Sequence, residues 1–74
     1  MSRKVYRVLP LGEKSWKVEI NKRVVSKHRD KDNAISEAKR KAKGQQPSQV
    51  VIHKRNGRIQ TEYTYKNDPR RTKG

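Results

Sequence analysis

The chain has 74 residues, and its 21 Lys and Arg against 7 Asp and Glu give a formal net charge of +14 at pH 7. This length limits it to one domain, and an apolar content of 28% without any Phe limits that domain to a small core. The sequence has no Cys, which excludes disulfides and thiolate metal sites, and its two His residues lack metal-ligand spacing. We find no apolar run that would span a membrane and no signal-peptide core, so we expect a cytoplasmic protein without a cofactor.

Two segments in the first half of the chain predict strands by their β-branched and aromatic residues. The first is 4–9, and we expect Pro10 to end it because proline cannot donate a hydrogen bond to a β-ladder. The other is 24–28, which follows a turn at 21–23.

Between these segments, residues 16–20 alternate between apolar and charged side chains, which predicts a half-buried strand. We expect Trp16 to be a core residue rather than a base-stacking one. The side chains predicted to be buried are Trp16, Val18 and Ile20, and those on the opposite face are Lys17 and Glu19.

A helix is predicted over residues 31–43. Asp30 is placed to act as its N-cap, with the carboxylate accepting from first-turn N–H groups, and Gly44 is placed to end it. Small apolar residues recur at helical spacing and predict a face that lies close to a sheet. They are Ala34, Ile35, Ala38 and Ala42.

The segment 49–65 predicts a β-hairpin, with Asn56-Gly57 as a two-residue type I′ loop. This loop would place Arg55 opposite Arg58, and those side chains would then either bind an anion or extend into water. The predicted core face is Val50, Ile52, Ile59, Thr61 and Tyr63. The predicted solvent face is Val51, His53, Arg55, Arg58, Gln60 and Glu62.

The element order β-β-β-α-β-β therefore predicts an α+β fold, with an antiparallel sheet and one helix on one face. We expect the domain to cover residues 1–66. Residues 67–74 predict a mobile, basic tail without an apolar anchor.

The most distinctive motif is VIHKRNGRIQ at 51–60. It resembles the V-I-H-x-R-D/N-G-R-I-Q signature of a family of small bacterial and phage proteins known as domain of unknown function 2188. Weaker similarities are Val8-Leu9-Pro10, Trp16-Lys17-Val18, Ala34-Ile35 and Asn67-Asp68-Pro69. The resemblance covers nearly the whole chain and implies the fold, but it supplies no function.

The sequence has no nucleophile beside a base, no P-loop and no dinucleotide-binding motif, so we expect no enzymatic activity. The charge favours a nucleic-acid-binding module, with DNA preferred over RNA. An acidic protein partner, as for a small phage-type inhibitor, is the alternative, and the protein is expected to be a monomer or weak homodimer.

The predicted nucleic-acid contacts divide into phosphate binders and base readers. The phosphate binders are Lys17, Arg40, Lys43, Arg55, Arg58, Arg70 and Arg71. The candidate base readers are His53 and Gln60, on a β-ribbon that would suit a major groove. For Arg55 and Gln60 the alternative is a structural role, in which they hold the hairpin to the C-terminal segment.

Overall fold

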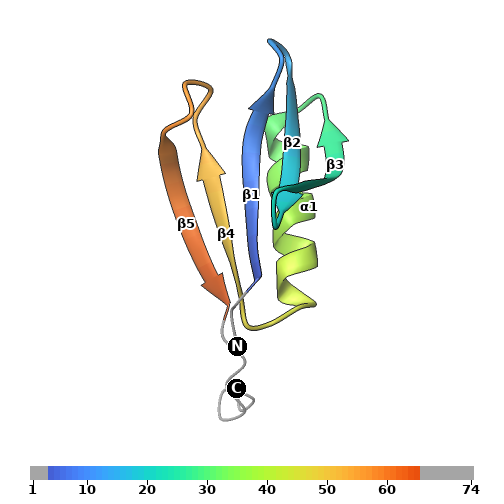
Figure 1. Cartoon of the computed structure of the whole chain (residues 1–74), viewed down its shortest axis with the longest axis vertical. Coiled ribbons are helices and arrows are strands. Elements are labelled where there is room, and N and C mark those ends of the chain that lie inside the picture. Colours follow the sequence, from blue (N-terminus) through green and yellow to red (C-terminus); the bar gives the residue numbers. More distant parts are fainter. Residues whose placement is uncertain (1–3, 66–74) are drawn as a thin grey trace.

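The computed structural model describes residues 4–65, which form a five-stranded sheet with one helix (Figure 1). The elements are β1 (Lys4–Leu11), β2 (Ser15–Ile20), β3 (Arg23–His28), α1 (Lys31–Lys43), β4 (Ser48–His53) and β5 (Ile59–Tyr65). The predicted α+β class is confirmed. The predicted tail, 67–74, lies outside the described residues. Within residues 4–65, no helix has the length and apolar character needed to cross a bilayer.

The sheet is mixed, with the strand order β3-β2-β1-β4-β5. The predicted all-antiparallel sheet was wrong, because β1 and β4 pair in parallel. Two antiparallel pairings separate β3 from β1, so these two strands run in the same direction. The helix then crosses from β3 to the far side of β1 and returns β4 in that direction, as helical crossovers do.

Pro10 does not end the first strand, contrary to the prediction. It lies within β1 and is paired with Trp16 of β2. The pairing of β1 with β4 ends at Val8 and Ile52, so within residues 4–65 no strand neighbours Pro10 on its β4 side. Proline is tolerated there because no ladder needs its missing N–H.

The core lies between α1 and the sheet, and its predicted members from β2 and α1 are confirmed. Ala34, Ala38 and Ala42 are fully buried, and Ile35 packs against the same cluster. Their small side chains let α1 approach the strands closely. The strand residues of this core are Tyr6, Val8, Trp16, Val18, Val50 and Ile52, with Ile20 at its margin.

Asp30 precedes the helix with an extended backbone, as an N-cap does, but its side chain caps no N–H group of the helix. The predicted cap bond is therefore wrong. Instead, the carboxylate accepts a hydrogen bond from Asn33 Nδ2 at 3.4 Å. Asn33 competes for the oxygen because it stands where a capping box would have Glu or Gln.

The type I′ turn was predicted at Asn56-Gly57, but the structure has it in a different hairpin. It joins β2 to β3, where Asn21 and Lys22 both have positive φ, 54° and 65°. In the loop between β4 and β5, only Gly57 has positive φ, 94°. There the Gly57 N–H donates to the Lys54 carbonyl, and the Lys54 N–H donates to the Arg58 carbonyl. This is a three-residue loop whose glycine takes the left-handed position.

The loop is one residue longer than predicted, and this changes the pairing register near it. Val50 and Ile52 pair with Tyr63 and Thr61 as predicted, but His53 pairs with Ile59 rather than Gln60. A bulge at this point absorbs the extra residue and restores the predicted pairing beyond it. Arg55 is consequently not opposite Arg58.

The burial of several residues of β4 and β5 also differs from the prediction. Ile59, opposite His53, is 51% exposed, and Tyr63 is 38% exposed, although both were predicted to be core residues. The helix packs against the other four strands, and Figure 1 shows that it leaves β5 uncovered. Val51 and His53 were predicted to face solvent but are buried, at 4% and 8% exposure.

Candidate nucleic-acid interface

The predicted nucleic-acid contacts are distributed over both faces of the sheet. Lys17 lies on the face that α1 does not cover, where its Nζ is 2.9 Å from Glu19 Oε2. Lys43 lies at the last turn of α1, behind the sheet. Arg70 and Arg71 are outside the described residues. The structure therefore does not gather the predicted set into one surface.

His53 is held inside the hairpin by both of its ring nitrogens. Nδ1 is 2.9 Å from the Gly57 carbonyl oxygen, and Nε2 is 3.3 Å from Arg7 Nη1. A carbonyl only accepts and a guanidinium only donates, so these contacts fit a ring that donates from Nδ1 and accepts at Nε2. Its one donor and one acceptor are both used within the fold, which leaves neither for a base edge.

Arg55 crosses from the β4–β5 loop to the β1–β2 turn. Its Nη1 donates to the carbonyl oxygens of Gly12 and Ser15, at 3.0 and 3.3 Å. Its guanidinium carbon lies 4.4 Å from the centroid of the Trp16 ring. These contacts favour the structural role for Arg55, although its partner is the β1–β2 turn and not the C-terminal segment.

Lys31 stands over the same tryptophan, with its Nζ 4.7 Å from the ring centroid of Trp16. It also donates a hydrogen bond to Gln60 Oε1, so Gln60 is fastened to the start of the helix. Burial lowers the pKa of Lys31, and the positive charges of Arg55 and Lys54 lower it further. Two cations thus share one indole at this corner of the molecule.

Arg40 belongs to an ion-pair group on the helix. Its Nη2 lies 2.6 Å from Glu37 Oε2, and Lys41 Nζ lies 3.5 Å from the same oxygen. The hydrogen bond from Arg40 lowers the pKa of Glu37, and the carboxylate in turn raises the pKa of the guanidinium. Part of the predicted positive charge at this end of α1 is therefore neutralised internally.

The other flank of α1 carries three lysines, Lys31, Lys39 and Lys43, which we call the lysine row. Each helix residue turns by about 100°, so the position before a buried alanine and the one after it lie on opposite flanks. Glu37 comes just before Ala38, whereas Lys39 comes just after it. On the second flank, the positions spaced by four are Lys31, Ile35, Lys39 and Lys43, with no acidic residue among them.

The lysines of this row extend over tyrosines of β5. Lys39 Nζ is 4.1 Å from the ring centroid of Tyr63, and Lys43 Nζ is 5.9 Å from that of Tyr65. We call these four residues, together with Lys31, the lysine–tyrosine surface. It forms because β5 lies beyond the helix, so that lysine stems rather than helix backbone reach the strand.

Lys31, Lys39, Tyr63 and Tyr65 were not among the predicted contacts. The signal for the lysines was their spacing of four or eight along the helix, and that for the tyrosines was their spacing of two along a strand. Arg58 was predicted. It comes directly before β5, at the end of the strand away from Tyr65, and its backbone N–H donates to Asn56 Oδ1. The described part of the chain gives its side chain no ion pair.

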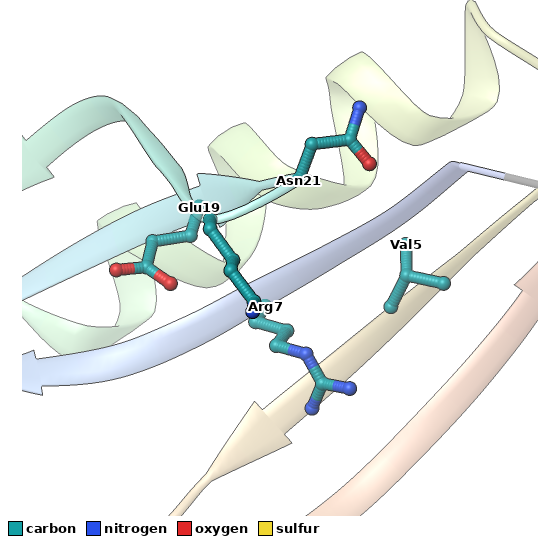
Figure 2. A pocket seen from close by; sticks show the side chains of 5 residues that line it. Val5, Arg7, Glu19 and Asn21 are labelled. Carbon is teal, nitrogen blue, oxygen red and sulfur yellow. The ribbon is translucent and has the colours of Figure 1, made fainter.

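The helix-free face has a shallow pocket of about 230 Å³. Val5, Arg7, Glu19, Asn21 and Lys22 line it, and none of them is a predicted contact. Figure 2 shows the Arg7 side chain reaching toward β4, whereas the Glu19 carboxylate points away from the Arg7 guanidinium. Among residues 4–65 there is also no group of three or more His, Asp or Glu side chains that could hold a metal ion.

Comparison with known proteins gives one match. A family model described as an uncharacterized protein conserved in bacteria (DUF2188) matches residues 6–65. The match covers most of the chain and every helix and strand except the first residues of β1. No curated protein matches, and no solved structure matches. The chain therefore belongs to the bacterial DUF2188 family, as the hairpin motif indicated.

Proposed function

We propose that this protein binds nucleic acid without catalysing a reaction, mainly through phosphate contacts. The observation that supports this most is the lysine row on α1, because among residues 4–65 Lys39 and Lys43 have tyrosine rings as neighbours and form no ion pair. A cation that is already ion-paired gives up that pair when it binds phosphate, as Arg40 would. Lys39 and Lys43 give up only a weak contact with a ring.

The whole charge distribution supports the same partner. At +14, the chain attracts polyanions over a range of about 8–10 Å at moderate salt. The lysine row provides the site where such a partner would be held at short range. Arg58 and Lys54, exposed at the β4–β5 loop, extend this positive region beyond the start of the helix. We favour DNA over RNA as the partner, and a cytoplasmic location.

The test is the salt dependence of binding to a short fluorescein-labelled single-stranded DNA, followed by anisotropy. Each phosphate contact contributes about 0.7 to the slope of log affinity against log salt for a single strand. The double variant Lys39→Gln/Lys43→Gln should therefore lower the slope by about 1.4 and weaken binding at low salt.

Lys27→Gln is the matched control, because Lys27 is exposed on β3 and pairs with Lys17 on the helix-free face. It removes the same kind of charge away from the lysine row, and its slope should stay near that of the unsubstituted protein. An equal loss from the control and from a single Lys39→Gln change would show that net charge alone determines binding. An affinity that does not change with salt would refute phosphate binding.

The outer edge of β5, which pairs with no strand among residues 4–65, supports a second candidate function, which is strand addition to another chain. Its seven residues, Ile59–Tyr65, include no Lys, Arg or Pro, which are the residues that usually protect an edge. The other edge strand, β3, has Arg23 and Lys27. Sedimentation velocity at two concentrations tests self-pairing, because a monomer at both would exclude it in that range.

A further inference from the structure

Tyr63 and Tyr65 are large aromatic residues that contribute little to the core, although the core is small. The core cluster does not include Tyr63, and Tyr65 only packs at its margin. Since they are two positions apart on one strand, their side chains point to the same side of the sheet, the side that carries α1. They are about 7 Å from each other along the strand. Both rings have a lysine ammonium over them.

A lysine ammonium group interacts only weakly with an exposed aromatic ring. Such a contact changes an equilibrium constant by about two- to fivefold. A nucleic-acid base stacked on the same ring changes it by about five- to 150-fold. A base can therefore displace the ammonium group, and the freed lysine then lies beside the phosphates that flank that base.

The spacing of the two rings selects the form of nucleic acid. Bases in a duplex are about 3.4 Å apart along each strand, and their faces are covered by their neighbours. Rings about 7 Å apart can each take a base only if the bases are separated from one another. That arrangement is available to an extended single strand and not to a duplex.

We propose that Tyr63 and Tyr65 stack with bases of a single-stranded nucleic acid, while Lys39 and Lys43 move from the rings to its phosphates. This inference rests on the proposed function and adds the form of nucleic acid that is bound. Gln60, fastened to Lys31, and the exposed Arg58 lie where the strand would continue toward the β4–β5 loop.

The test compares Tyr63→Leu, Tyr63→Phe and the unsubstituted protein, each titrated into a labelled single-stranded DNA and into the same strand annealed to its complement. Tyr63→Leu should weaken single-strand binding by about five- to 150-fold. The salt slope should be unchanged, because no charge is lost. Tyr63→Phe keeps the ring, so its affinity for the single strand should equal that of the unsubstituted protein. Binding to the duplex should be nearly the same for the two variants and the unsubstituted protein.

Ile59→Ala is the matched control, since Ile59 is an exposed apolar residue of the same strand but stands opposite His53. The fluorescence of Trp16, the only tryptophan, reports whether each variant is folded. If Tyr63→Leu binds the strand as tightly as the unsubstituted protein while Lys39→Gln/Lys43→Gln binds weakly, stacking is refuted and phosphate binding stands. If the unsubstituted protein binds neither probe, the proposed function falls and stacking falls with it.

Discussion

Replacing Arg55 with alanine should destabilise the fold much more than replacing Arg58, the other arginine of the β4–β5 loop. The substitution removes two hydrogen bonds to the carbonyls of Gly12 and Ser15 and the cation over Trp16. Each exposed bond is worth about 0.5–1.5 kcal/mol and the ring contact about 0.5–1 kcal/mol. Because relief of repulsion with Lys31 offsets part of this loss, we expect a net loss of about 2 kcal/mol.

Urea unfolding followed by Trp16 fluorescence measures this loss directly, and the melting temperature should fall by roughly 10 °C in a domain of this size. Arg55→Lys should keep little of the stability, because an ammonium group cannot reproduce the planar guanidinium. Arg58→Ala is the control. Its side chain has no ion pair in the described part of the chain, so its effect should stay within about 0.5 kcal/mol. Equal effects of Arg55→Ala and Arg58→Ala would refute the structural role of Arg55. The pKa of Lys31, followed by NMR, should rise in Arg55→Ala.

Three further substitutions test other parts of the fold. Lys22→Gly should stabilise the protein by about 0.5–1 kcal/mol in urea unfolding, because a lysine at φ 65° is strained, and no gain would contradict the type I′ turn. Glu37→Gln should remove a stabilising contribution that is fully present above pH 4.5 and is lost as the pH falls through the lowered pKa of Glu37. The stability difference between Glu37→Gln and the unsubstituted protein should therefore shrink in acid, and a constant difference from pH 6 to pH 3 would contradict the ion pair with Arg40. Ala38→Leu should cost about 1–3 kcal/mol, since Ala38 is fully buried against the sheet, and a neutral effect would show a looser helix contact.

The parts of the fold that follow local patterns could be predicted from the sequence. The helix begins and ends at the predicted residues, and its alanines are buried, because a 3.6-residue period is a property of neighbouring positions. The alternation in β2 likewise placed Trp16 and Val18 in the core. The parallel pairing of β1 with β4 depends on where a helix returns the chain, and nothing within either strand specifies it.

The β4–β5 hairpin shows where local reasoning fails. Asn56-Gly57 is compatible with a two-residue type I′ loop and with a three-residue loop that uses only Gly57 in the left-handed region. The choice between them shifts the nearby register by one residue, and one residue reverses a side chain from one face to the other. The compensating bulge at Gln60 is not marked by glycine or proline, so Ile59 was predicted to be buried.

The candidate surface was less predictable than the fold, because its members meet only in three dimensions. Arg55 contacts residues about 40 positions earlier in the chain, so its commitment to a turn was invisible in the sequence. The lysines of α1 and the tyrosines of β5 each follow a visible period. They meet because the helix packs on the other four strands and leaves β5 uncovered, so that lysine side chains can lie over Tyr63.

The most direct test of the account is a ¹H–¹⁵N NMR titration of the protein with a short single-stranded DNA at low salt. We predict that the shifted resonances cluster on the flank of α1 and on β5, at Lys39, Lys43, Tyr63 and Tyr65, and that the shifts reverse when salt is added. Shifts centred on Lys17 and the pocket of the helix-free face, or no shifts at a saturating concentration of DNA, would contradict it.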